Sequence, residues 1–199
     1  MTRTHLLLVR HLSHERNKLS MDSLRLGFSI GKNLRKLLEE LGIPLPSFAQ
    51  TSPQPRAVET LLIILHGMDN MIPIFSDVGL GDLLLGEYPF SQEDLTELTE
   101  RVAANNSTPE EVLLSDPFFK EVLNLRGLEG AHAILNTIRR HPGETILQCS
   151  HGGSRIEATL AKLQGYPDVQ ETKLRFKTGD IALLTFEDCV LVTTEYPIL

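Results

Sequence analysis

The sequence predicts a three-layer α/β fold, with a mostly parallel central sheet and helices on both of its faces. Strand-like and helix-like segments alternate along the 199 residues. Two short apolar runs, Leu6–Val9 and Ile146–Cys149, are typical of buried strands. Each run leads into a histidine, His11 or His151. Because open α/β sheets bind ligands at the carboxyl ends of their strands, we expect both histidines to face one crevice.

The first part of the chain alternates regularly between strand and helix. A strand over Thr4–His11 is followed by a long helix over Asp22–Leu41, in which apolar residues recur near helical spacing. The segment Gly42-Ile43-Pro44 ends that helix. The further elements expected before residue 79 are a strand over Phe48–Ser52, a helix over Pro55–His66 and a strand over Met71–Phe75.

The middle of the chain is less regular. Gly79–Phe90 is expected to be a loop, and Ser91–Ala104 a helix with Ser91 as its N-cap and an acidic first turn. The polar, turn-like stretch Ala104–Asp116 predicts a mobile insertion or a cap. We therefore expect one domain over residues 1–199, with a variable cap or insertion around residues 79–124.

The last part of the chain returns to regular alternation. A helix over Leu128–Arg140 stops before Pro142-Gly143. The elements expected after it are a strand over Glu144–Ser150, a helix over Gly153–Leu163, and strands over Asp180–Phe186 and Val190–Glu195 that pair through a turn at Glu187-Asp188.

Composition indicates a globular protein of the cytoplasm. Hydrophobic content is 41% and charged content is 23%, both ordinary values. No apolar run approaches the ~20 residues that span a bilayer, so no membrane partner is expected, and Met1–Val9 is interpreted as a strand rather than a signal peptide. Cys149 and Cys189 both lie in apolar, strand-like contexts, which fits free buried thiols in a reducing compartment.

The charge balance argues against nucleic acid as a partner. The chain carries 26 acidic and 19 basic residues, for a net charge of −7. A duplex binder normally presents a basic stripe. Any anion-binding site must therefore be built locally, from a few converging arginines and helix ends.

Three motifs together resemble a known family. In chain order they are Arg10-His11 with Asn17, Ser52-Pro53-x-x-Arg56-Ala57-x-x-Thr60, and Ser150-His151-Gly152-Gly153. This pattern resembles the histidine phosphatase superfamily, also called the phosphoglycerate mutase-like family. The resemblance covers most of the chain, and each motif follows an expected strand.

The resemblance implies that His11 is a nucleophile that forms a phosphohistidine intermediate. A neutral imidazole can attack phosphorus through one nitrogen if the other donates to a fixed acceptor. With an ordinary pKa of ~6.5, much of it is neutral at pH 7. Arg10 and Arg56 would hold the phosphoryl oxygens, since a guanidinium donates in a planar, bidentate fashion and stays charged.

The remaining site residues also follow from the resemblance. His151 would hydrogen-bond the phosphoryl group, and Gly152 would let the backbone approach it at a helix N-terminus. Asn17 matches a phosphate-contacting position, although it also suits a loop cap. The general acid is expected at Asp82, in Leu80-x-Asp82-x-x-x-Gly86, with Glu87 as second choice.

The chain departs from the family pattern at several positions. Leu12 replaces the usual glycine and is expected to crowd the mouth of the pocket. Ser13 and His14 replace an acid and a threonine, and the customary Ile-Arg is reversed as Arg155-Ile156. None of these changes removes a catalytic group, but they leave reduced activity as an alternative.

Two rival site assignments use the same residues. Cys149 and Arg155 satisfy Cys-x-x-x-x-x-Arg, the phosphate loop of cysteine-dependent phosphatases, but the customary preceding histidine is Gln148 and the first two motifs stay unexplained. His11 and His14 have a His-x-x-His spacing, which needs a helix to bind a metal. This segment leaves a strand, so neither a metal nor another cofactor is expected.

The expected function is hydrolysis of a phosphomonoester in a small phosphorylated metabolite. One alternative is a phosphoglycerate mutase-type transfer, which is disfavoured because Leu95–Asn124 offers only Arg101 and Lys120 as cations to hold a carboxylate. The other alternative is a non-catalytic module that binds a phosphorylated ligand on the same fold. The sequence sets neither the physiological substrate nor the oligomeric state.

Overall fold

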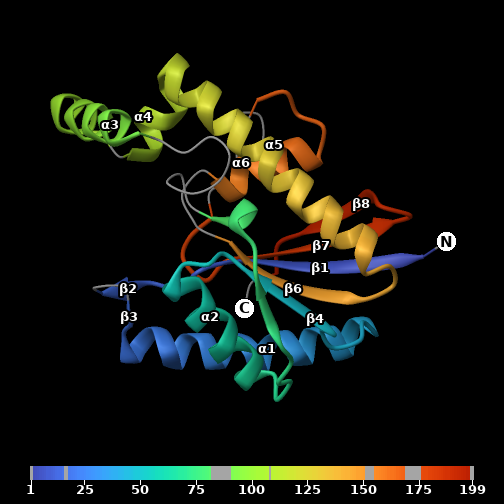
Figure 1. Cartoon of the computed structure of the whole chain (residues 1–199). Helices are drawn as coiled ribbons and strands as arrows, with labels where there is room; N and C mark the ends of the chain where they lie inside the picture. The colour runs from blue at the N-terminus through green and yellow to red at the C-terminus, as the bar shows by residue number, and fades with distance from the viewer. Residues whose placement is uncertain are drawn as a thin grey trace.

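A computed structural model describes residues 2–15, 18–81, 91–107, 109–150, 155–168 and 176–197. These residues form a six-stranded sheet in the order β5-β4-β6-β1-β7-β8 (Figure 1). Its strands are β1 (Arg3–Arg10), β4 (Phe48–Thr51), β5 (Ile74–Ser76), β6 (Thr145–Ser150), β7 (Ile181–Glu187) and β8 (Val190–Glu195). Strands β5, β4, β6 and β1 run parallel to one another, whereas β7 is antiparallel to both β1 and β8. The predicted mostly parallel sheet is confirmed.

The sheet lies between two helical layers. Helices α1 (Met21–Leu41) and α2 (Pro55–Gly67) cover one face, and α5 (Pro117–Arg140) and α6 (Arg155–Leu163) cover the other (Figure 1). Successive β1 side chains point to opposite layers. Leu7 and Val9 belong to the core with α1 and α2, whereas Leu6 and Leu8 belong to the core with α5 and α6. This alternation confirms the predicted three layers.

Local signals in the sequence explain several element ends. Ser20 caps α1 by accepting a hydrogen bond from the Ser23 amide, and Gly42 closes that helix with a φ of 68°. Strand β5 begins at Ile74 rather than Met71, because Pro73 has no N–H to donate to a ladder. Strand β1 ends at Arg10, so His11 follows the strand.

The expectation of a turn-like stretch over Ala104–Asp116 was wrong. After α3 (Gln92–Asn105), whose Ser91–Asp94 capping box confirms the predicted N-terminus, the chain forms α4 (Pro109–Ser115). Val112, Leu113 and Leu114 of α4 are buried, in one cluster with Phe119 and Leu123. Burial of these side chains stabilises the helix, which the sequence did not indicate because the residues on either side of it are polar.

Helix α5 also begins eleven residues before the predicted Leu128. Asp116 is its N-cap and accepts from the amides of Phe118 and Phe119, with Pro117 in the first turn. Figure 1 shows α3 and α4 beside the amino-terminal end of α5. No helix in the described part of the chain is long and apolar enough to cross a membrane.

The two cysteines differ in context. Both are free thiols, and Cys149 is buried in β6 as expected. The expected strand-like context was wrong for Cys189, which lies half-buried in the turn between β7 and β8. Asp188 and Cys189 have φ values of 48° and 69° there, as a tight hairpin turn requires.

Candidate functional site

His11 lies where β1 meets the end of β6. The backbone amide of His11 donates to the Ser150 carbonyl at 3.3 Å, and Arg10 is the strand partner of Ser150. The residue before His151 is therefore in direct contact with the proposed nucleophile. His151 itself, with Gly152, Asn17, Asp82 and Glu87, lies outside the described residues.

The His11 ring is held in one tautomer. Its Nδ1 is 2.8 Å from the Leu12 carbonyl oxygen, which can only accept, so Nδ1 carries the proton. Nε2 then carries the lone pair that a nucleophile needs. The residue is only 5% exposed. This geometry matches the fixed acceptor that the sequence interpretation required.

Burial also keeps His11 neutral. Desolvation is the main cause that lowers its pKa from 6.5 to about 4, and the positive charges of Arg56 and Arg10 act in the same direction. The hydrogen bond to the Leu12 carbonyl opposes them. The imidazole is therefore uncharged, and available as a base or nucleophile, throughout the neutral range.

We expect the His11 ring to titrate near pH 4 in two-dimensional NMR spectra, assigned by comparison with His11→Ala. Because this pKa lies below the 6.5 of an unperturbed histidine, the unfolded chain binds more protons between these values. The free energy of unfolding should fall as the pH drops through that window, by about 3 kcal/mol at most, and this contribution should be constant below it. A His11 midpoint near 6.5 would contradict the buried, neutral ring.

Arg56 lies in the first turn of α2, half-buried beside the His11 segment. Thr60, one turn further on, is fully buried. Its hydroxyl donates to the Arg56 carbonyl at 2.7 Å and accepts from the Leu12 amide at 3.0 Å. Thr60 thus ties the backbone after His11 to the helix turn that carries Arg56. The sequence motif contains Thr60, but its role as a bridge was not predicted.

Arg10 is also half-buried and lies close enough to lower the pKa of His11. Its guanidinium NH1 donates to the Phe176 carbonyl, which anchors the side chain to the segment before β7. The structure therefore brings Arg10, His11 and Arg56 together from two elements distant in sequence. Their contacts with a phosphoryl group stay predictions.

The comparisons with known proteins agree with this geometry. The family model described as the histidine phosphatase superfamily (branch 1) matches residues 6–196. The chain belongs to this superfamily. No curated protein matches it.

Several solved structures are similar to this chain over nearly its whole length. Phosphoserine phosphatase from Entamoeba histolytica has a TM-score of 0.67 at 17% identity, with 98% of both chains covered. Phosphoglycerate mutase from Bacillus anthracis str. Sterne has a TM-score of 0.64 at 17% identity, covering 98% of this chain and 93% of the other. A mycobacterial glucosyl-3-phosphoglycerate phosphatase has a TM-score of 0.64 at 14% identity, covering 100% and 99%. At these identities the likeness establishes the fold.

The expectation that Leu12 crowds the pocket mouth was wrong. Its side chain is fully buried in the core with α1 and α2. Gly27 and Gly179 make room for it, since a β-carbon at these positions would lie 2.7 Å and 3.2 Å from its methyl groups. The larger residue after His11 is therefore accommodated on the core side.

A set of buried contacts that the sequence did not indicate holds the short 3₁₀ helix η1 (Val78–Leu80). The Ser150 hydroxyl at the end of β6 donates to the Leu80 carbonyl at 3.1 Å. Arg155, which is 1% exposed at the start of α6, donates to the Gly79 carbonyl. The reversed Arg155-Ile156 pair thus has a structural role, and η1 is fixed beside the end of β6.

The same helix is held from the sheet side. Asp77 accepts from the Gly79 amide at 2.7 Å through one oxygen, and from Gln50 Nε2 at 2.8 Å through the other. Gln50 in turn accepts from Gln148 Nε2 at 2.9 Å. A chain of buried and half-buried polar groups therefore connects β6 and β4 to the backbone of η1.

The environment of Cys149 opposes the cysteine mechanism. The residue is fully buried in β6, and burial raises the pKa of its thiol far above the ordinary range. A thiolate is required for attack on phosphorus. Cys149 therefore has the environment of a core residue.

We expect Cys149→Ala to retain phosphatase turnover within about twofold, after correction for any loss of stability from the smaller side chain. The kcat and KM for p-nitrophenyl phosphate would be measured below the thermal transition of the variant. Loss of turnover in folded Cys149→Ala, with retention in His11→Ala, would transfer the nucleophile to the thiol.

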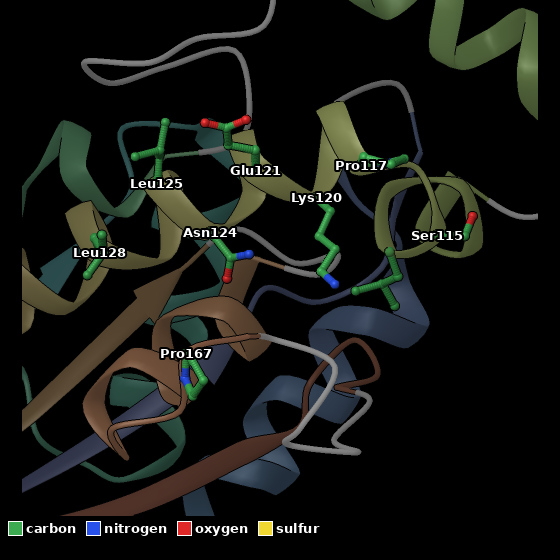
Figure 2. Close-up of a pocket in the computed structure, with 9 residues that line it drawn as sticks. Ser115, Pro117, Lys120, Glu121, Asn124, Leu125, Leu128 and Pro167 are labelled. Atoms are coloured by element: carbon green, nitrogen blue, oxygen red, sulfur yellow. The ribbon is translucent and has the colours of Figure 1, made fainter.

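A separate pocket of ≈ 510 Å³ lies between α4, the start of α5 and Pro167 (Figure 2). Its lining includes Ser115, Lys120 and Asn124 but neither His11 nor Arg56. Lys120 forms an ion pair with Asp168.

The described residues contain no group of three or more acids, histidines or cysteines that could hold a metal.

Proposed function

We propose that this protein hydrolyses phosphomonoesters of small metabolites through a phosphohistidine intermediate. The observation that carries the proposal is the buried His11 imidazole, fixed by the Leu12 carbonyl with Nε2 unprotonated. Arg10 and Arg56 supply positive charge beside it. The superfamily and the similar structures are phosphatases or mutases, which supports an enzyme of this kind.

In the proposed first step, His11 Nε2 attacks phosphorus in line as the P–O bond to the leaving group breaks. Asp82 donates a proton to the departing oxygen. Water then attacks the phosphohistidine and gives a proton to the Asp82 carboxylate, the P–N bond breaks, and inorganic phosphate leaves. Arg10, Arg56, His151, Asn17 and the Gly152 amide hold the phosphoryl oxygens in both steps.

Asp82 remains our choice for the acid, ahead of Glu87. Support comes from the backbone just before it, because Ser150 and Arg155 hold the carbonyls of Leu80 and Gly79. A general acid must be held at a fixed distance from the nucleophile, which a well-anchored backbone favours. Asp82 follows Leu80 by only two residues in the sequence, and on this ground we propose its carboxyl group as the acid.

Hydrolysis is preferred over mutase-type transfer. The two cations of Leu95–Asn124 are both engaged, since Arg101 pairs with Asp116 and Glu97, and Lys120 pairs with Asp168. They offer little to a substrate carboxylate.

The position of Leu12 in the core removes one of the arguments for a non-catalytic binding module. Free thiols at Cys149 and Cys189 fit the cytoplasm, where we propose the enzyme works without a metal.

The test is release of inorganic phosphate from p-nitrophenyl phosphate and from a panel of phosphorylated metabolites, scored by kcat/KM. We expect turnover that a chelator leaves unchanged, and a phosphoenzyme that survives alkaline quenching but is lost in acid. Interconversion of phosphoglycerates without phosphate release would favour the mutase. Phosphate binding without any turnover would favour the binding module.

A further inference from the structure

His14 lies within the site but has no part in the proposed chemistry. It is half-buried at the start of β2 (His14–Glu15). Its Nε2 is 3.4 Å from NH1 of Arg56. Its ring stands edge-on to the His11 ring, with the centroids 5.5 Å apart at an angle of 73°. The imidazole therefore touches the phosphate-binding arginine and the nucleophile at once.

The chemistry of the contact assigns the roles of donor and acceptor. A guanidinium has only N–H donors, so His14 Nε2 must accept from Arg56. The His14 ring is then neutral, with its proton on Nδ1. Burial is the main cause that lowers the pKa of His14, and the charge of Arg56 lowers it further. Both effects favour the neutral form that can accept.

The backbone around His14 is well held. His14 pairs with Leu19 of β3 (Lys18–Leu19) in a two-stranded ladder. The Ser23 hydroxyl of α1 donates to the Ser13 carbonyl at 2.6 Å. Glu59 of α2 accepts from the Leu19 amide at 3.1 Å. The imidazole thus projects from a backbone tied to both α1 and α2, where it can restrain a neighbouring side chain.

We propose that His14 is a positioning residue that orients the Arg56 guanidinium. By engaging NH1, it sets the plane in which the remaining donors of Arg56 meet the phosphoryl oxygens. This inference rests on the proposed phosphate site. A planar, bidentate donor depends strongly on its orientation, so loss of the restraint should weaken phosphate binding and turnover together.

Two substitutions of His14 distinguish the effect of its hydrogen-bond acceptor from the effect of its aromatic ring. His14→Phe keeps an aromatic edge against His11 but removes the acceptor, and His14→Gln restores an acceptor through its amide oxygen. The exposed His132 on α5 provides the control His132→Phe. We would measure the Kd of inorganic phosphate by calorimetry, kcat and KM for p-nitrophenyl phosphate, and the thermal transition of each variant.

We expect His14→Phe to weaken phosphate binding and lower kcat/KM by about tenfold each, the usual scale of a hydrogen bond to a charged group. His14→Gln should stay within about threefold of the unsubstituted protein, and His132→Phe should be unchanged. In an Arg56→Ala background, His14→Phe should have no further effect, because His14 acts on the phosphate only by orienting Arg56.

Several results would overturn the assignment. His14→Phe could bind phosphate as tightly as the unsubstituted protein, His14→Gln could be as impaired as His14→Phe, or the effects of His14→Phe and Arg56→Ala could simply add. Because calorimetry measures phosphate binding without turnover, it distinguishes failure of the His14 assignment from failure of the proposed function. If the variants bind phosphate with the expected ranking of Kd values but none of the proteins hydrolyses a substrate, hydrolysis is refuted and the positioning role of His14 stands.

Discussion

Replacing His11 by alanine should lower kcat/KM for p-nitrophenyl phosphate by at least about a thousandfold, or about 4 kcal/mol of transition-state stabilisation. The imidazole supplies the only bond to phosphorus that the proposed enzyme makes in the first step. Its Nε2 is available because Nδ1 donates to the Leu12 carbonyl. Alanine leaves the arginines in place, so inorganic phosphate should still bind.

The control for this substitution is His132→Ala, which changes an exposed histidine on α5. It should keep full activity, and both variants should unfold at similar temperatures. His11→Ala should also yield no alkali-stable phosphoenzyme after rapid quenching. Activity in His11→Ala within tenfold of the unsubstituted protein would show that another group attacks phosphorus.

The sheet and its two helical layers could be predicted because local signals agree with the tertiary structure. Leu6–Val9 is a continuous apolar run, and Ile146–Cys149 is interrupted only by Gln148, because both faces of their strands are buried. The amphipathic pattern of α1 and the Gly42 that follows it both indicate the same helix. Where several local signals coincide in this way, a single sequence is enough.

Helix α4 could not be predicted because its signal is mostly tertiary. A seven-residue helix is marginal alone, and its three buried side chains gain stability only by packing against other helices, chiefly α3 and α5. The orientation of Leu12 has a similar origin. The space for that side chain is created by Gly27 and Gly179, which are distant from it in sequence.

The supporting contacts of the site were missed for a related reason. Thr60 contacts Leu12 across 48 positions of the chain, and Arg155 reaches Gly79 across 76 positions. A motif identifies the groups that touch the reacting atoms, because their chemistry restricts the residue type. The residues that orient those groups need only a donor or an acceptor in the right place, which many residue types can provide.

Arg56→Ala should lower kcat/KM by about a hundredfold to a thousandfold, the usual cost of one donor that stabilises developing charge. At ~4 Å and an effective dielectric of about 20, the charge alone interacts with a phosphoryl oxygen by about 4 kcal/mol. Arg56→Lys should recover only part of the loss, because an ammonium restores the charge but not the planar pair of donors.

The same substitution has a second expected readout at His11. The charge of Arg56 is one cause that lowers the pKa of His11 to about 4, so Arg56→Ala should raise the NMR midpoint of that ring toward 6.5. Arg25→Ala is the matched control, since Arg25 is 77% exposed on α1 and pairs only with Asp22 among the described contacts. It should change neither value. An unaltered His11 midpoint together with full activity in Arg56→Ala would mean that this guanidinium does not face the nucleophile in solution, and the proposed phosphate site would then lose its main source of positive charge.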